Sequence, residues 1–355
     1  MEAIIVAGGL GTRLRPLTVT TPKHLLPVAG TALVAHQLAK LAEAGVARVV
    51  LATSYHADQF EPELGDGRTW GVELSYVTER ELLGTGGAIR NAAAHLESAA
   101  DDPVVILNGD ILSGHSLEAQ LRHHETASAD VTLHLVEVPD ARAYGCVPTH
   151  DGRVTAFLEK SPDPVSRQIN AGCYVFRRSV VDDIPAGRVV SVERETFPCL
   201  VAAGALVLGH LDQRYWIDVG TPAALCRASA DVVRGVAHSA AFRGVPGEAF
   251  VAPDATLAAG ASAYGGSSLG AGVTVAAMAV VDGSVVASGA TIGEGALVVD
   301  SVVGPGAKVG AGVVLREAVI GDQAVVGDGC ELVAGARVWP GHQLAPGAVR
   351  FSPDV

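Results

Sequence analysis

The 355-residue sequence lacks the features of membrane, secreted and nucleic-acid-binding proteins. It has no apolar run of about 18 residues, so no membrane-spanning helix is expected. Its N-terminus lacks the basic region of a signal peptide, which favours a cytoplasmic location. Five cysteines without a C-x-x-C pair argue against a structural zinc site and against a disulfide framework. A net charge of −13 disfavours a nucleic-acid polymer as partner, because such binding needs basic surfaces.

The first two thirds of the chain alternate short apolar runs with segments of helical spacing. Apolar residues at Leu33, Val34, Leu38 and Leu41 predict a helix over residues 32–44. Strands are predicted on both sides of this helix and later in the chain, at residues 3–6, 48–52, 104–107 and 131–138. The order strand, helix, strand predicts an α/β domain with a Rossmann-like mixed, mostly parallel sheet and helices on both faces.

Beyond about residue 249 an aliphatic or small residue recurs about every six positions, and glycine becomes dense. Such a period is typical of a left-handed parallel β-helix, here with about five or six coils. An all-β sandwich is the alternative, which the regularity of the period disfavours. We therefore predict a catalytic domain over residues 1–228, a linker over 229–248 and a β-helix over 249–355. The repeat positions are Val251, Leu257, Ala263, Leu269, Val275, Val281, Ala287, Ile292, Val298, Val303, Val309, Leu315, Ile320, Val326, Leu332, Val338 and Leu344.

The loop after the first predicted strand has the composition of a phosphate-binding turn. Gly8, Gly9 and Gly11 allow backbone N–H groups to approach phosphate oxygens closely. Arg13 and Lys23 follow as two cations that suit a polyphosphate. The segment is neither a dinucleotide-binding fingerprint nor a Walker A loop, because the third glycine and the Gly-Lys-Ser/Thr ending are missing. An ordinary tight turn with solvated cations is the alternative interpretation.

Two aspartates have settings that suit a divalent cation. Asp110 follows a predicted strand at the carboxyl edge of the sheet, where ligands of such folds bind, and Asp218 lies in an otherwise apolar turn. Mg²⁺ is typically held by one or two carboxylates together with substrate phosphates and water. A helix N-cap is the alternative role for an aspartate that follows a strand.

Several motifs resemble those of the sugar-1-phosphate nucleotidylyltransferases, also called NDP-sugar pyrophosphorylases. G-G-L-G-T-R-L-R-P-L-T at residues 8–18 and P-K-H-L-L-P-V at 22–28 match the two loop motifs of that family. L-N-G-D at 107–110 and W-I-D-V-G-T at 216–221 match its metal-binding segments. The resemblance covers nearly the whole chain, including the hexapeptide tail. It implies transfer of a nucleotidyl group from a nucleoside triphosphate to a sugar 1-phosphate, with release of pyrophosphate and Mg²⁺ as cofactor.

The resemblance also implies roles for individual residues. Asp110 and Asp218 would hold Mg²⁺, and Asp110 would also face the sugar phosphate. Arg13 and Lys23 would act in catalysis on the triphosphate, and Lys160 would hold the attacking phosphate. Further nucleotide-binding residues would be Ala7, Gly8, Gly9, Gly11, Thr12, Gly84, Thr85, Gly86 and Asn108. Further acceptor-binding residues would be Tyr144, Gly145, Glu159, Asn170, Gly172 and Glu193.

Some of these positions have other interpretations from the residues alone. Glu159 and Lys160 are neighbours, so on a strand they face opposite ways, and a solvated pair is the alternative. Glu193 could contact the sugar or anchor a helix start. Tyr174 and Phe176 alternate on one face of a strand and are predicted to be core residues.

The segment L-G-T-G-G-A-I at residues 83–89 occupies the position at which the family recognises the base. This form is closest to guanylyltransferases for mannose- or heptose-type 1-phosphates, which favours GTP. A glucose-type or cyclitol phosphate also suits the motifs as acceptor. The alternatives are a thymidylyl- or uridylyltransferase on glucose 1-phosphate, use of an adenine nucleotide, and a non-catalytic regulatory subunit. An acyltransferase is disfavoured, because His342 is the only histidine within the repeats. The β-helix is expected to support a homo-oligomer, as a dimer or tetramer.

Overall fold

The computed structural model describes residues 1–79, 81–158 and 160–350. By its internal contacts the chain forms two compact units. We call Met1–Gly9 with Gln37–Trp216 the first unit, and Leu10–His36 with Ile217–Val355 the second unit. Helix α1 (Leu33–Glu43) and strand β13 (Trp216–Asp218) cross from one unit to the other. The domain boundaries near residues 228 and 248 that the sequence suggested stay a prediction.

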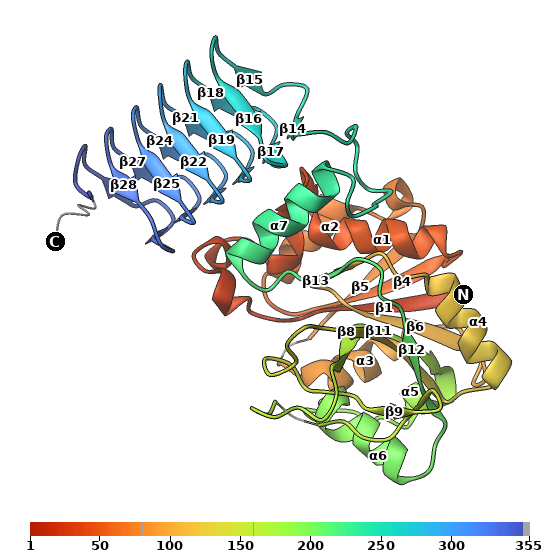
Figure 1. Ribbon diagram of the computed structural model, residues 1–355. Helices are drawn as coiled ribbons and strands as arrows, with labels where there is room; N and C mark the ends of the chain where they lie inside the picture. Colours follow the sequence, from red (N-terminus) through yellow and green to blue (C-terminus); the bar gives the residue numbers. More distant parts are fainter. Residues whose placement is uncertain (80, 159, 351–355) are drawn as a thin grey trace. The chain divides into compact units, whose positions relative to one another are not determined.

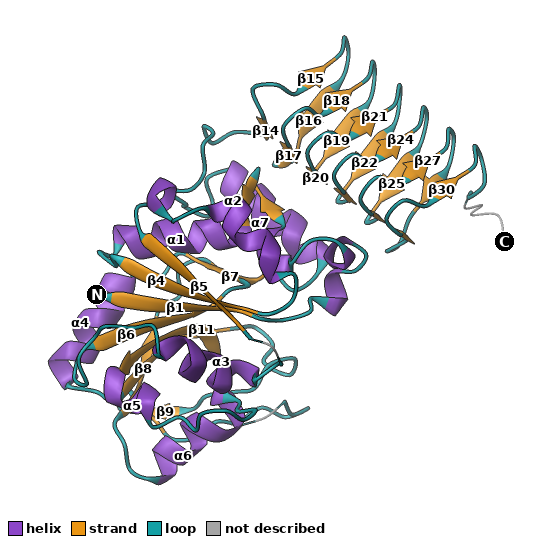
Figure 2. Ribbon diagram, turned by 180° about the vertical axis from the view of Figure 1, so that it is seen from behind, coloured by secondary structure: helices purple, strands orange, loops and turns teal. Residues whose placement is uncertain are grey.

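The first unit is built on a nine-stranded mixed sheet (Figures 1 and 2). Its order is β5-β4-β1-β6-β11-β8-β12-β10-β9. Strands β5, β4, β1 and β6 run parallel, β11 is antiparallel to both of its neighbours, and β12 is parallel to β8. The strands of this unit are β1 (Glu2–Ala7), β4 (Arg48–Thr53), β5 (Glu73–Thr78), β6 (Pro103–Asn108), β7 (Ile111–Ser113), β8 (Val131–Glu137), β9 (Thr149–His150), β10 (Arg153–Val154), β11 (Gln168–Arg177) and β12 (Val207–Leu211).

The predicted strands and helix are confirmed, each within a residue or two of its predicted ends. The mostly parallel order also confirms the predicted α/β fold. The remaining helices of the first unit are α2 (Phe60–Leu64), α3 (Gly84–Ala93), α4 (Leu117–Ala127), α5 (Arg178–Asp182) and α6 (Phe197–Ala202).

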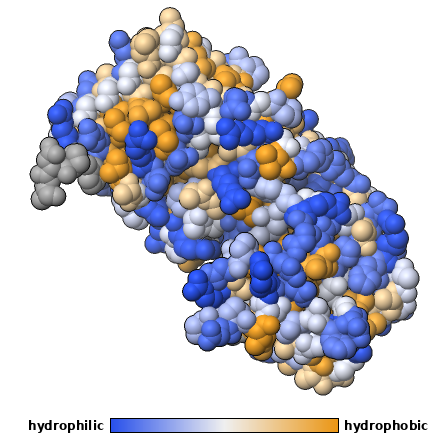
Figure 3. Space-filling view, in the orientation of Figure 1, coloured by the Kyte–Doolittle hydropathy of each residue, from blue (hydrophilic) through white to orange (hydrophobic). Residues whose placement is uncertain are grey.

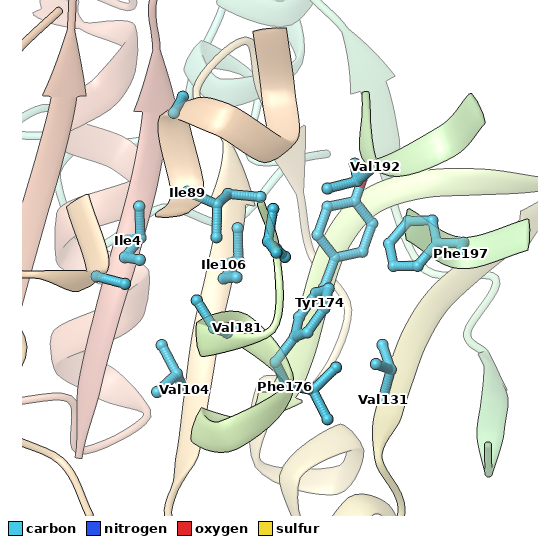
Figure 4. Close-up of a cluster of buried hydrophobic side chains, with 14 of the residues drawn as sticks. Ile4, Ile89, Val104, Ile106, Val131, Tyr174, Phe176, Val181, Val192 and Phe197 are labelled. Atoms are coloured by element: carbon cyan, nitrogen blue, oxygen red, sulfur yellow. The ribbon is translucent and has the colours of Figure 1, made fainter. Parts of the chain in front are cut away.

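One face of this sheet carries the main hydrophobic core (Figure 4). Side chains of the strands, among them Ile4, Ile106 and Tyr174, pack there against α3, α5 and α6. Tyr174 and Phe176 are fully buried, which confirms their prediction as core residues. The opposite face packs against α4, since buried Gln120 of this helix donates hydrogen bonds to the carbonyls of Thr132 and Cys173.

The second unit begins with the remainder of the glycine-rich loop. Three short 3₁₀ turns at Thr12–Leu14, Leu17–Val19 and Lys23–Leu25 lead into a hairpin of β2 (Pro27–Val28) and β3 (Thr31–Ala32). Helix α7 (Pro222–Val233) is capped at its N-terminus by Thr221, whose side chain accepts a hydrogen bond from Ala224 N. No helix among the described residues is long and apolar enough to cross a membrane, and the expected cytoplasmic location stays a prediction.

The rest of the second unit is the predicted β-helix, made of three parallel sheets of six, six and five short strands. Partners within each sheet are 17 or 18 residues apart, as in Val285↔Val302 and Val319↔Arg337, so each coil contributes one strand to each sheet. The strands are β14 (Ala249–Val251), β15 (Thr256–Leu257), β16 (Ser262–Tyr264), β17 (Ser267–Leu269), β18 (Thr274–Val275), β19 (Val280–Asp282), β20 (Val285–Val286), β21 (Thr291–Ile292), β22 (Leu297–Val299), β23 (Val302–Val303), β24 (Lys308–Val309), β25 (Val314–Arg316), β26 (Val319–Ile320), β27 (Val325–Val326), β28 (Glu331–Leu332), β29 (Arg337–Val338) and β30 (Gln343–Leu344).

The repeat positions of the sequence form the core of the β-helix. From Leu269 to Val338 the predicted positions are buried in one continuous cluster, with a single exception. The exception is Ala287, because Val286 occupies the core position and pairs with Leu269 and Val303 on either side. The side chain of Ala287 therefore does not belong to this ladder.

Candidate active site

The glycine turn starts at the carboxyl end of β1, between the ends of β4 and β6. The register places Ala7 beside Thr53 and Val6 beside Asn108. The Ser54 hydroxyl donates a hydrogen bond of 2.5 Å to the Gly8 carbonyl. A Cβ at Gly8 would lie only 3.2 Å from the Ser54 Oγ, so the absence of a side chain is used for close packing.

Glu79 lies next to this turn and was not identified from the sequence. Its Oε2 would be 3.6 Å from a Cβ at Gly8, and its backbone N–H donates to the Thr53 carbonyl at the end of β4. Burial raises the pKa of the Glu79 carboxyl. The only signal in the sequence was an acidic residue directly after a half-buried strand, which is also common on protein surfaces.

In the second unit, the rest of the loop brings together two of the predicted residues, Gly11 and Lys23. Gly11 adopts a φ of +60°, and a Cβ there would meet Thr18 at 2.9 Å and the Cβ of Lys23 at 3.1 Å. The Thr18 hydroxyl donates to the Gly11 carbonyl at 2.8 Å. Lys23 therefore lies against the glycine turn, as expected of a cation that faces the same phosphates.

Arg13 of the same loop faces Asp218. The closest approach between guanidinium and carboxylate is 3.7 Å, and the Arg13 side chain is 66% exposed, so it remains accessible to a ligand. Gly220 makes room for this arrangement, because a Cβ there would collide with Nη2 of Arg13. Arg13, which is predicted to bind the triphosphate, and Asp218, which is predicted to bind the metal, are thus neighbours within the second unit.

Asp110 lies in the two-residue turn between β6 and β7, and it is half-buried. The N–H of Gly109 donates to the Val6 carbonyl at 2.9 Å, which ties this turn to the end of β1. Asp110 belongs to the first unit and Asp218 to the second, so their convergence on one ion stays a prediction.

The chemistry of these residues fits a divalent cation. Within the described residues, no three His, Cys, Asp or Glu side chains are grouped so as to hold a metal ion by themselves. Two half-buried carboxylates are nevertheless the hard oxygen donors that Mg²⁺ prefers when substrate phosphates complete its coordination.

Beside the Asp110 turn, three predicted binding residues form one group. Gly172 adopts a φ of +76°, and a Cβ there would lie 3.0 Å from Nδ2 of Asn108. The Asn170 amide donates to the Tyr174 hydroxyl at 2.8 Å, and the Asn108 amide approaches the same oxygen at 3.4 Å. A register shift in β11 between Asn170 and Tyr174 makes this grouping possible. Residues predicted to bind the nucleotide and residues predicted to bind the acceptor therefore meet at the carboxyl end of β6.

Tyr144 and Gly145, also predicted to bind the acceptor, lie next to Cys146, which pairs with Ile169 of β11. The rings of Tyr144 and Trp216 meet edge to face at 6.0 Å, and the Trp216 indole donates to the Ala171 carbonyl at 2.9 Å. Cys146, two residues after Tyr144, pairs with both Ile169 and Leu158. Gly145 is half-buried between them, and Lys160 is exposed shortly after Leu158. Glu159 lies outside the described residues.

The segment predicted to recognise the base has a packing role in the structure. Gly86 N–H and Gly87 N–H both donate to the Val190 carbonyl, at 2.8 and 3.3 Å. A Cβ at Gly84 would lie 2.6 Å from that carbonyl oxygen. The glycines therefore let residues 188–190 approach the start of α3, and contact with a base stays a prediction.

Thr85 and Glu193 belong to one hydrogen-bonded network. The Thr85 hydroxyl donates to Oε2 of Glu193 at 3.0 Å and accepts from Val192 N at 3.0 Å. The Ser191 hydroxyl donates to the same carboxylate oxygen at 2.9 Å. Of the two roles left open for Glu193, this geometry favours anchoring the turn of π-helix at Val192–Thr196.

Comparison with known proteins assigns the family. The profile described as "Nucleotidyl transferase" matches residues 2–235, and that of the "GMPPB C-terminal domain" matches residues 245–348. The chain belongs to the nucleotidyl transferase family, and the predicted fold and enzyme class are confirmed.

The relatives narrow the class further. Over 357 residues the chain is 52% identical to the mannose-1-phosphate guanylyltransferase of Mycobacterium tuberculosis (strain ATCC 25618 / H37Rv), covering 100% of this chain and 99% of that protein. It is 36% identical to mannose-1-phosphate guanyltransferase beta-A of Xenopus laevis over 225 residues, 62% of each chain.

Solved structures agree in fold. HddC from Yersinia pseudotuberculosis, complexed with GMP-PN, matches with a TM-score of 0.55 and 28% identity, over 64% of this chain and 97% of that chain. A putative glucose-1-phosphate thymidylyltransferase from Bacillus anthracis has a TM-score of 0.61 at 24% identity, over 69% of this chain and 100% of that chain, which shows the fold alone.

Proposed function

We propose that this protein transfers a guanylyl group from GTP to mannose 1-phosphate, forming GDP-mannose and pyrophosphate. The observation that supports the proposal is the 52% identity over the full length to a protein named mannose-1-phosphate guanylyltransferase. The structure groups Asn108, which is predicted to bind the nucleotide, with Asn170 and Gly172, which are predicted to bind the acceptor. This grouping supports a single site for both substrates.

The proposed reaction is a single in-line displacement. A phosphate oxygen of mannose 1-phosphate, held by Lys160, attacks the α-phosphorus of GTP. The bond between that phosphorus and the oxygen leading to the β-phosphorus breaks, and pyrophosphate leaves. The acceptor phosphate is already ionised at neutral pH, so no general base is needed, and positioning and electrostatics carry the catalysis.

The residues of the loop bind the triphosphate in this proposal. Gly8 to Gly11 and Arg13 contact the β- and γ-phosphates, and Lys23 offsets the charge of the leaving pyrophosphate. Asp110 and Asp218 would hold a divalent cation, Mg²⁺ in our proposal, whose charge would stabilise the oxygens around the α-phosphorus. Arg13 then exchanges its contact with Asp218 for phosphate oxygens.

A homo-oligomer is part of the proposal, with the β-helix as the contact region. The face in Figure 3 includes clusters of apolar side chains among polar ones. Large apolar side chains that the β-helix leaves exposed are Val251, Leu257, Tyr264, Met278 and Trp339. Sedimentation of the purified protein tests this part separately.

The direct test is pyrophosphate release by the purified protein with five nucleoside triphosphates and a panel of sugar 1-phosphates. We expect GTP with mannose 1-phosphate to give the highest kcat/KM. Asp110→Asn should lower kcat by about 10²-fold or more, as for loss of one electrostatic stabiliser, whereas exposed Asp101→Asn should not. A higher kcat/KM with another triphosphate or acceptor would refute the assigned substrates, and an active Asp110→Asn would refute its metal role.

A further inference from the structure

Helix α1 supplies a buried side chain to the turn that carries Asp110. Gln37 is 4% exposed, and its Nε2 donates hydrogen bonds of 2.7 Å to two backbone carbonyls, those of Asn108 and Ile111. These two residues flank Gly109 and Asp110 directly. A single amide group therefore bridges both ends of the two-residue turn.

The orientation of this amide is fixed by its surroundings. Two carbonyl oxygens accept from it, and only the NH₂ end of a glutamine has two donors. The opposite orientation would bring Oε1 within 2.7 Å of both oxygens, which is repulsive. The Gly109 N–H also donates to the Val6 carbonyl of β1. The sheet therefore holds the turn on one side, and α1 holds it on the other.

We propose that Gln37 is a positioning residue for Asp110, which sets the carboxylate in place to hold the divalent cation. The inference rests on the proposed function, because Asp110 is assigned to the cation there. Mg²⁺ demands near-ideal octahedral geometry, so the position of each ligand matters. Loss of an outer partner that orients a metal ligand typically lowers metal affinity or activity by about 10- to 100-fold.

Lys40 provides the matched control, three residues further along the same helix. Its Nζ donates to the Ser113 carbonyl at 2.7 Å and contacts Nδ1 of His115 at 2.8 Å. Like Gln37, it connects α1 by hydrogen bonds to the chain around β7, but beyond the Asp110 turn. Removal of the Lys40 hydrogen bonds shows whether any loosening of α1 from this segment weakens cation binding.

The experiment measures Mn²⁺ binding to the full-length protein by electron paramagnetic resonance, with α,β-methylene GTP as uncleavable nucleotide. Gln37→Met keeps the volume and removes both donors. We expect its Mn²⁺ dissociation constant to rise by about 10-fold or more. The Mg²⁺ concentration for half-maximal activity should rise in parallel. Lys40→Met should retain the wild-type Mn²⁺ affinity.

Gln37→Glu adds a readout that a purely structural role would not give. An ionised carboxylate would face two carbonyl oxygens and displace the turn, whereas the protonated acid donates one hydrogen bond. Mn²⁺ affinity of this variant should therefore recover toward the wild-type value as pH falls, and that of Gln37→Met should not. If Gln37→Met does not fold, the pH dependence of Gln37→Glu is compared with that of the wild type instead.

The outcomes separate the two proposals. If Asp110→Asn leaves Mn²⁺ binding unchanged, the metal assignment of the proposed function is wrong. If Asp110→Asn weakens binding but Gln37→Met does not, Gln37 is not a positioning residue. Equal weakening by Lys40→Met, or a Gln37→Glu variant without pH dependence, would also overturn the inference.

Discussion

At the scale of single residues, the first unit holds two stacked histidines in its interior. The ring centroids of His115 and His134 lie 3.8 Å apart, and both side chains are buried. Burial lowers the pKa of His134 to about 4 and that of His115 well below its ordinary value. Neighbouring Lys40 and His210 lower both pKa values further, whereas Asp212 raises that of His134. Both rings are therefore neutral in the folded protein at physiological pH.

This pair predicts a loss of stability in acid. A histidine with a lowered folded pKa contributes nothing unfavourable above the unfolded pKa of 6.5 and destabilises the fold as pH falls toward the folded value of about 4. Each such group adds a slope of about 1.4 kcal/mol per pH unit to the free energy of unfolding in that window. In the His134→Phe variant, the free energy of unfolding should change less steeply with pH, by about 1.4 kcal/mol per pH unit, because one proton fewer is taken up on unfolding. Urea unfolding between pH 4 and 7 measures this slope.

The matched control is His150→Phe, because His150 is exposed on a short strand. Its slope should equal that of the wild type. A His134→Phe variant with an unchanged slope would contradict the prediction, whatever its stability at neutral pH.

At the scale of elements, serines form a ladder at one corner of the β-helix. Ser267, Ser284 and Ser301 are buried and 17 residues apart. The Ser284 hydroxyl accepts from Ser301 N at 3.0 Å and donates to the Asp282 carbonyl at 2.8 Å. Ser267 accepts in the same way from Ser284 N, and Ser301 from Ala318 N. The hydroxyls thus satisfy backbone groups that the corner would otherwise leave buried and unpaired.

Ser284→Ala should therefore lower the stability of the β-helix. The substitution leaves the Ser301 N–H buried without an acceptor, which costs about 1–3 kcal/mol. Denaturant unfolding followed by circular dichroism measures the loss. Ser288→Ala removes an exposed hydroxyl from the same sequence region and should be neutral. Equal stabilities of the two variants would show that the ladder contributes little.

The sequence predicted elements more reliably than the packing of particular side chains. Apolar periodicity was sufficient for β1, α1 and the β-helix, because burial of one face imposes it on the sequence. The periodicity assigned Ala287 instead of Val286 to the core ladder of the β-helix, because these two adjacent residues are both apolar. Gln37, Glu79 and the packing of Gly86 on Val190 depend on contacts between distant segments, which no local pattern encodes.

At the scale of the whole molecule, residues of the β-helix contact the loop near the N-terminus within the second unit. The Thr20 hydroxyl donates to Oδ2 of Asp322 at 2.6 Å, across 302 positions of sequence. The Arg337 guanidinium donates to the carbonyls of Arg13 and Arg15. The loop predicted to bind the triphosphate is thus held partly by side chains from the opposite end of the chain.

A double-mutant cycle tests this connection. Thr20→Val and Asp322→Ala should each destabilise the protein, and the double variant should lose less than their sum. We expect a coupling free energy of about 1 kcal/mol, which is usual for one hydrogen bond. Pairing Thr20→Val with exposed Asp254→Ala should give additive effects. Additivity in the Asp322 cycle as well would indicate that the bond adds nothing to stability.

The constant spacing of the central coils has a consequence for how this chain can change over generations. Successive strands of the central coils are related by a shift of 17 residues, so each coil presents nearly the same edge to the next. Duplication or loss of one such block would preserve every register on either side of it. The tail can therefore lengthen or shorten in whole coils, and the partners that are 18 residues apart, such as Val319↔Arg337, show that a coil also accepts one extra residue.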